Sequence, residues 1–254
     1  MSTVTRYEIR ERAAWITLDS PANRNALSAP LVSELGQHLR AAVADDAVRA
    51  IVLTGAGPAF CAGADLKNRG DAVVRGGGPN PFIEILRLMW EGPKPVVVAA
   101  NGHAFGGGVG LVAAADIAIA VEGATFSFSE VRVGVIPAMI SVVVLPKIGA
   151  NQAMRLFLTG ARFDAREAKG YGLVHHVAPA DGLVAAAEEQ VRTLALGGPI
   201  AVAEAKRLIR TVARLPMDEA FAYAEAKIAA LFASEEAAEG MMAFAQKRKP
   251  RWAE

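Results

Sequence analysis

The sequence predicts an α/β fold that continues into an all-helical C-terminal region. A continuously apolar stretch, residues 96–99, follows a proline and is typical of a fully buried strand. Three glycines and then a run of small apolar residues, 109–115, indicate a buried helix directly after it. From residue 181 onward the apolar pattern is almost entirely helical. Together these observations predict alternating strands and helices over residues 1–195 and helices over residues 196–254.

The N-terminal elements follow from local signals taken in order. Residues 7–18 alternate loosely between apolar and polar and predict a hairpin or two short strands. Ser28 is a good N-cap with a proline just inside, so a helix is expected over residues 29–44. Residues 50–54 predict a second buried strand. Residues 81–90 carry large apolar side chains on one face and predict an amphipathic helix.

The second half of the chain yields shorter strands and longer helices. Residues 116–121 and 124–129 predict two strands, and residues 150–158 predict a helix. Asp164 followed by Glu167 forms a capping-box pattern, which predicts a helix reaching about residue 169. Residues 173–177 predict a short strand, and the C-terminal pattern predicts helices over residues 181–196, 199–212, 217–233 and 235–246.

Composition excludes several classes of function. The chain has 254 residues, 53% of them hydrophobic, and a net charge of +1, so no nucleic-acid surface is expected. Cys61 is the single cysteine, which rules out an internal disulfide and favours a reducing cytoplasm. The four histidines show no ligand spacing, so no metal site is expected. No signal segment or membrane-length apolar run is legible.

The glycines at 106–108 mark a candidate binding site. The first N–H groups of a helix have no intrahelical partner and carry partial positive charge, which suits a group that is or becomes negative. A second strand is followed by a glycine loop, residues 59–67, which offers further free N–H groups. The glycines could instead only allow close packing. A dinucleotide pattern at 108–113 is disfavoured because its N–H groups lie inside the helix.

Glu130 is the candidate acid–base group. It lies in the mainly apolar segment 126–137, where burial would raise its pKa. The structural alternatives are an ion pair with Arg132 or a carboxylate at a helix start. The Gly- and Arg-rich segment 69–81 predicts a mobile loop over a site.

The two strand–glycine–helix units, with Ser129-Glu130 and Gly134-Val-Ile-Pro137, resemble the enoyl-CoA hydratase/isomerase (crotonase) family. The resemblance covers most of the chain. It implies a spiral of β-β-α turns, here residues 1–195, and a C-terminal helical region used in oligomerisation, residues 196–254. It also implies a homotrimer or homohexamer that acts on acyl-CoA thioesters in fatty acid metabolism.

The resemblance implies roles for particular residues. The N–H groups of Ala64 and Gly107 would hold the thioester oxygen, and Glu130 would move protons. Coenzyme A would be part of the substrate, with no separate cofactor and no metal. Residues that would line it are Arg24, Ala62, Asp65, Leu66, Lys67, Phe244 and Lys247, and the last two could reach it from a neighbouring subunit.

One departure from the family pattern leaves the reaction open. Typical hydratases carry a first glutamate three residues after the position of Gly107, where this chain has Gly110. A single carboxylate suits isomerisation of a 3-enoyl-CoA to a 2-enoyl-CoA. The segments 105–111 and 129–141 favour the hydratase reading, because they resemble a branch that also places glycine there. A crotonase-fold protein that only binds acyl-CoA is the third alternative.

Overall fold

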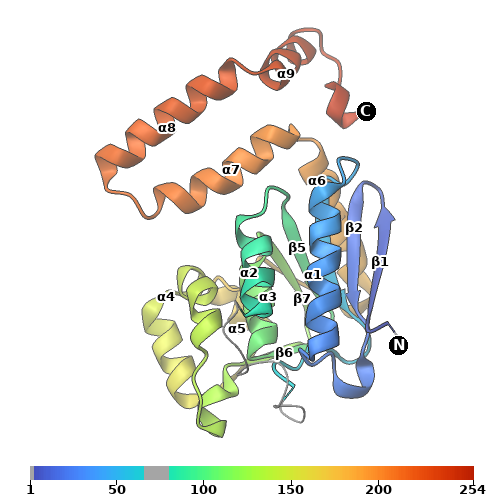
Figure 1. The fold of residues 1–254 in the computed structure, drawn as a ribbon, viewed down its shortest axis with the longest axis vertical. Coiled ribbons are helices and arrows are strands. Elements are labelled where there is room, and N and C mark those ends of the chain that lie inside the picture. The colour runs from blue at the N-terminus through green and yellow to red at the C-terminus, as the bar shows by residue number, and fades with distance from the viewer. Residues whose placement is uncertain (1–2, 66–79) are drawn as a thin grey trace.

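The computed structural model describes residues 3–65 and 80–254, and its core contains two sheets (Figure 1). The larger sheet has the strand order β1-β2-β3-β5-β7-β10. Only the β1–β2 pair is antiparallel, and the other neighbours are parallel. The strands span β1 Thr5–Arg10, β2 Ala13–Leu18, β3 Ala50–Gly55, β5 Val96–Ala100, β7 Ile117–Val121 and β10 His176–Ala178.

The smaller sheet is built from strands of three residues each, in the order β4-β6-β8-β9. They span β4 Ala59–Cys61, β6 His103–Phe105, β8 Thr125–Ser127 and β9 Arg162–Asp164. Each of the first three follows closely on a strand of the larger sheet, so two strands in succession precede each crossover helix. This repeated β-β-α turn is the predicted spiral.

Helices cover the larger sheet and form most of the core with it. The N-terminal helices are α1 Ala29–Ala44, α2 Pro81–Glu91 and α3 Gly107–Ala114, and α6 Leu183–Ala195 packs on β3, β5 and β7. Helix α3 is buried on every side from Gly108 to Ala114, as its uniformly small apolar sequence requires. Residue-level expectations for α1 and α2 are confirmed to within one residue.

Three differences from the sequence-based expectations concern short or interrupted elements. Helix α4 spans Ala138–Thr159 and so begins well before the expected 150–158, with Pro146 inside it and a kink at Gly149. The expected loop 59–67 begins with strand β4. The expected strand 173–177 forms three residues later, as β10, after helix α5 Ala165–Gly170 with its confirmed Asp164–Glu167 capping box.

The C-terminal helices extend away from the sheets, at the end of the molecule opposite β6 (Figure 1). They span α7 Pro199–Val212, α8 Met217–Phe232 and α9 Glu235–Ala245. Helix α7 is tied to the core by Asp116, which pairs with Lys206 at 2.8 Å and Arg210 at 2.6 Å. In the described part of the chain, no helix is both long and apolar enough to cross a membrane.

Candidate active site

The two glycine loops meet because the strands before them are paired. Strands β4 and β6 run parallel, with Cys61 opposite Ala104, so both chains leave the sheet at the same edge. The loop after β4 turns at Gly63, whose φ is +86°. A Cβ at Gly63 would lie 2.6 Å from the Phe105 carbonyl oxygen and 3.5 Å from the Gly107 nitrogen. The loops carrying Ala64 and Gly107 are therefore neighbours.

The N–H groups of Ala64 and Gly107 are candidates for donating hydrogen bonds to an oxygen atom of a ligand. Gly107 is the first residue of α3, so its N–H has no partner within the helix. Within residues 3–65 and 80–254, neither N–H donates a backbone hydrogen bond in a loop or turn. Their neighbours are used: Leu27 donates to the Gly63 carbonyl at 2.8 Å and Gly106 donates to the Ser127 carbonyl at 3.0 Å.

Glu130 reaches the same place from the 3-10 helix Ser129–Val133. Its Oε1 lies 3.0 Å from the position that a Cβ at Gly106 would occupy. Its Oε2 is buried and has no hydrogen-bond partner among the described residues. Burial raises the pKa of Glu130, and a hydrogen bond with its own backbone only partly opposes this. A carboxylate with a free oxygen and a raised pKa is suited to taking up and releasing a proton.

Apolar side chains pack against the start of α3. A Cβ at Gly107 would lie 2.5 Å from Leu27 Cδ1 and 3.4 Å from the Phe82 ring. Leu27 and Phe82 are both buried, with exposed fractions of 7% each. An apolar surround strengthens electrostatic interactions with the N–H groups because it excludes water.

The residues expected to hold coenzyme A divide into three groups. Arg24 and Ala62 are joined by a 3.0 Å backbone hydrogen bond, and Asp65 lies three residues past Ala62, so this part of the set is brought together. Leu66 and Lys67, and most of the expected mobile loop 69–81, lie outside the described residues. Phe244 and Lys247 belong to the C-terminal region, at the far end of the chain's fold from β6 (Figure 1).

Arg132 does not pair with Glu130 in the described structure. Its guanidinium donates to the Thr159 carbonyl at 3.4 Å and packs against Gly160. The alternative reading of Glu130 as half of an ion pair with Arg132 is therefore wrong. Within residues 3–65 and 80–254, no group of three His, Cys, Asp or Glu side chains is placed to hold a metal ion.

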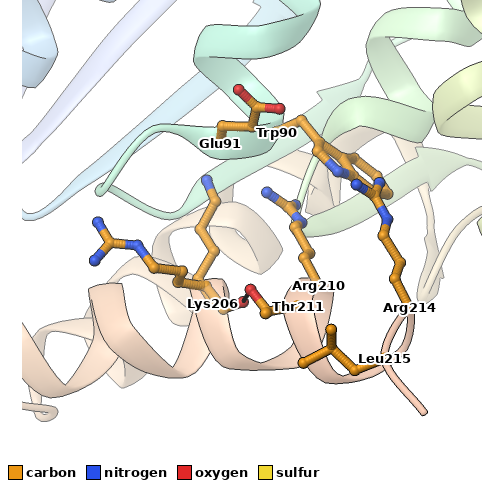
Figure 2. Close-up of a pocket in the computed structure, with 8 residues that line it drawn as sticks. Trp90, Glu91, Lys206, Arg210, Thr211, Arg214 and Leu215 are labelled. Atoms are coloured by element: carbon orange, nitrogen blue, oxygen red, sulfur yellow. Dashed lines mark hydrogen bonds between the residues drawn. The ribbon is translucent and has the colours of Figure 1, made fainter. Parts of the chain in front are cut away.

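A pocket of about 370 Å³ lies elsewhere, between α2 and α7. Figure 2 shows Lys206 and Arg210 of α7, and Arg214 just beyond its end, reaching toward Trp90 and Glu91. Trp90 is eight residues along α2 from Phe82, the residue of that helix that lies beside Gly107. The pocket is therefore about 12 Å along α2 from the start of α3. Arg210 stacks on the Trp90 ring at 4.1 Å, so this region fastens α7 to the core.

Sequence reasoning missed two residues that support the segments around the site. Asn25, fully buried, donates to the carbonyls of Ala56 and Ala59 at 2.9 Å each and so fixes the chain leading to Leu27. Ile140 covers Gly110 from helix α4. The position of Asn25 in a turn-rich loop was a signal that the sequence offered. Ile140 lies in the half of α4 that was not predicted, so the sequence offered no such signal for it.

Within the described residues, the spiral of β-β-α turns brings the loops of Ala64 and Gly107 beside a carboxylate whose Oε2 has no hydrogen-bond partner, an arrangement suited to stabilising an oxyanion. Residues 8–254 match the family model described as enoyl-CoA hydratase/isomerase. The chain therefore belongs to the enoyl-CoA hydratase/isomerase family and has the crotonase fold.

Individual relatives are similar to this chain over nearly its whole length. Carnitinyl-CoA dehydratase of Escherichia coli K12 is 36% identical over 93% of each chain. Among solved structures, Pseudomonas aeruginosa AtuE is 38% identical with a TM-score of 0.91, covering 99% of this chain and 100% of its own. An enoyl-CoA hydratase/isomerase from Marinobacter aquaeolei is 37% identical with a TM-score of 0.90, covering 99% of both chains.

Proposed function

We propose that this protein is an enoyl-CoA hydratase-type enzyme that adds water across the double bond of a 2-enoyl-CoA thioester. The observation that carries the proposal is that Glu130 Oε2, beside the N–H groups that begin α3, has no hydrogen-bond partner in the part of the chain that the structure describes. Family membership implies an acyl-CoA substrate, and coenzyme A is then part of that substrate and no separate cofactor is needed. The name of one relative, carnitinyl-CoA dehydratase, favours water chemistry.

In the proposed reaction the thioester oxygen accepts hydrogen bonds from the N–H groups of Ala64 and Gly107. Ionised Glu130 takes a proton from water as the water oxygen bonds to Cβ, and the double-bond electrons move onto the thioester oxygen. The enolate then collapses, and Glu130 returns the proton to Cα. Because charge builds on the oxygen only during reaction, each N–H stabilises the transition state more than the substrate, by about 3 kcal/mol.

A second candidate is isomerisation of a 3-enoyl-CoA to a 2-enoyl-CoA. It is favoured by Gly110, where a typical hydratase has its first glutamate, because one base suffices to remove the Cα proton and return it at Cγ. A third candidate, acyl-CoA binding without turnover, is weakened by the presence of both Gly107 and Glu130.

One assay separates these candidates. The parent protein is incubated with a 2-enoyl-CoA and, separately, with a 3-enoyl-CoA, and the absorbance of the conjugated thioester is followed. Loss of absorbance from the first supports hydration, and a gain from the second supports isomerisation. Binding without either change contradicts both catalytic proposals and supports the binding protein.

We further propose that the active assembly is a homotrimer, or a homohexamer made from two trimers. Large apolar side chains are exposed on the C-terminal helices, among them Phe221 at 70% and Phe244 at 86%. A second exposed apolar set lies on and before α4, including Ile136 and Val142. Two different apolar faces suit a head-to-tail contact that closes into a ring.

In such a ring, Phe244 and Lys247 of one copy would reach the coenzyme A bound by the next, since helix α9 lies at the end of its own chain's fold opposite β6 (Figure 1). Light scattering tests the assembly directly. A mass of three or six chains is expected, and a stable monomer that retains full activity would contradict it.

A further inference from the structure

The N–H of Ala64 lies in a loop, whereas the N–H of Gly107 belongs to a helix. Gly107 opens α3, and the helix that follows fixes the direction of its N–H. Ala64 comes after the end of β4 at Cys61 and lies in no helix. The direction of the Ala64 N–H therefore depends on the part of the chain to which this loop is bonded.

The loop is bonded to the chain from Arg24 to Leu27. The Ala62 N–H donates to the Arg24 carbonyl at 3.0 Å, and the Leu27 N–H donates to the Gly63 carbonyl at 2.8 Å. Leu27 also pairs with Ala64 in an isolated parallel β-bridge. A displacement of the chain from Arg24 to Leu27 would therefore carry the Ala64 N–H with it.

The chain at Arg24 and Asn25 has a backbone conformation that needs support. The two residues have φ values of 58° and 55°, in the left-handed region that residues with a Cβ seldom occupy. Asn tolerates this region better than most residues, but Arg gains nothing from it. Two successive residues in this conformation persist only where surrounding contacts hold them.

Asn25 supplies these contacts with every polar atom of its side chain. Its Oδ1 accepts from the Ser20 N–H at 2.8 Å, and its Nδ2 donates to the carbonyls of Ala56 and Ala59 at 2.9 Å each. Asn25 is fully buried, so water does not replace these bonds. Ala59 is the first residue of β4, so the same amide is bonded to the strand that leads to Ala64.

We propose that Asn25 is a positioning residue for the oxyanion site, because its buried amide fixes the turn at Arg24 and, through it, the direction of the Ala64 N–H. Asn25 acts through the backbone of the chain from Arg24 to Leu27. This inference rests on the proposed function, in which the Ala64 N–H donates to the thioester oxygen. It adds the residue that determines where that donor points.

The first test separates turnover from binding. Asn25→Ala should lower kcat about 10- to 100-fold, because a displaced donor stabilises the oxyanion less well. The dissociation constant for a saturated acyl-CoA should stay within about threefold, since its thioester oxygen gathers no negative charge. Asn25→Gly is the second variant. Glycine adopts this φ without strain, so the variant removes the side-chain bonds alone and tests the inference even if Asn25→Ala does not fold.

Both variants lose buried hydrogen bonds and should melt below the parent, so a control for lost stability is needed. Val191→Ala removes buried apolar atoms from α6 and should also lower the melting temperature. It should keep the parent's kcat when all proteins are assayed well below their melting temperatures. A kcat loss in Val191→Ala as large as that in the Asn25 variants would overturn the inference.

A purely structural role for Asn25 would not move the carbonyl band of a bound thioester. The probe is a saturated acyl-CoA, isotopically labelled at its thioester carbonyl carbon, which has no double bond to react. Infrared difference spectroscopy should show its carbonyl stretch lowered on binding to the parent, because two N–H groups donate to the oxygen. In Asn25→Gly the band should return part of the way to its frequency in solution, whereas Val191→Ala should keep the parent's band.

An Asn25→Gly variant that keeps the parent's kcat overturns the inference. So does a loss of kcat with an unmoved carbonyl band, because the Asn25 amide would then act on something other than the oxyanion donor. Failure of the proposed function would look different. The parent itself would leave the carbonyl band at its solution frequency and turn over neither a 2-enoyl-CoA nor a 3-enoyl-CoA, which removes the oxyanion site that Asn25 would position.

Discussion

The carboxylate of Glu130 rests against the main chain of Gly106, with Oε1 3.0 Å from where a Cβ at Gly106 would stand. Gly106 has a φ of +49° and a ψ of −118°, a conformation that residues with a side chain rarely adopt. The turn that presents the Gly107 N–H therefore also sets how closely Glu130 can approach it.

Gly106→Ala should show whether the contact between the Gly106 turn and Glu130 matters for turnover. The added methyl group would push Glu130 away and strain the turn, and a displacement of about 1 Å can reduce turnover about 100-fold. Steady-state kinetics should show the loss mainly in kcat. Gly123→Ala is the control, because an added Cβ there has no atom within 4 Å. An unchanged kcat in Gly106→Ala would mean that the contact does not matter for turnover.

Glu130→Gln should change stability in a pH-dependent way. Because burial raises the pKa of Glu130, the unfolded chain loses this proton at lower pH than the folded chain. The ionised group therefore destabilises the fold above its folded pKa and has no effect below its ordinary value of 4.5.

The variant should then melt about 1–2 °C above the parent near pH 8, a small shift because solvent reaches the half-buried carboxylate. The difference should vanish below pH 4.5. Scanning calorimetry across this range measures it. A variant that is less stable than the parent at high pH would show that the ionised carboxylate is stabilised after all.

Asp116→Asn should loosen the C-terminal region from the core. Asp116 accepts a hydrogen bond from the Val96 N–H and forms ion pairs with Lys206 and Arg210. The side chains of these three charged residues are no more than 18% exposed. Removing the charge leaves two buried cations without their carboxylate, which should lower the free energy of unfolding by about 3–5 kcal/mol. Urea denaturation measures the change.

The control for Asp116→Asn is Glu8→Gln, which breaks an exposed ion pair with Arg10. Exposed pairs contribute less than about 1 kcal/mol, so this variant should resemble the parent. Equal effects from the two substitutions would mean that burial of the Asp116 cluster adds nothing.

Glu239→Gln should release the C-terminal tail. The Glu239 carboxylate accepts from both terminal nitrogens of Arg248, at 2.7 and 3.0 Å, and from the Arg251 N–H at 3.0 Å. These bonds lower the pKa of Glu239 to about 2. At neutral pH, trypsin should cleave the variant near Arg248 and Arg251 faster than the parent.

The contribution of Glu239 is present above its ordinary pKa of 4.5 and is lost as pH falls toward 2, because its folded pKa is depressed. The stability difference between parent and variant should therefore shrink in that window. A difference that stays constant down to pH 2 would show that the carboxylate charge is not what holds the tail.

Much of the fold follows from sequence patterns that are strong locally. Helix α7 spans Pro199–Val212, as the proline start and apolar period predict, and β5 extends the expected apolar run by one residue. Ser28 does occupy the N-cap of α1, although its side chain makes no capping hydrogen bond. Long periodic segments carry enough repeats to identify them.

The missed elements have physical reasons. Strands β4, β6 and β9 of the smaller sheet have three residues each, too few to show a period of two, whereas β8 lies within the expected strand 124–129. The first half of α4 contains Pro146 and leads to the kink at Gly149, both of which mimic helix ends. Tertiary packing, not local preference, keeps that segment helical.

The candidate site was predictable in part. Free N–H groups after two strands, and a carboxylate in an apolar segment, pointed to the two glycine loops and to Glu130, and the family resemblance then singled out Ala64 and Gly107. The structure brings the segments that carry these residues together. The contact between Gly110 and Ile140 was not predictable, because it joins elements whose separation in space depends on the whole spiral.

The most direct test of the account is turnover by Glu130→Gln, measured alongside its affinity for an acyl-CoA. The account predicts that the reaction found in the parent falls to background, because the amide cannot take up the proton, while acyl-CoA affinity stays within about twofold. Turnover at the parent rate by Glu130→Gln would contradict the account.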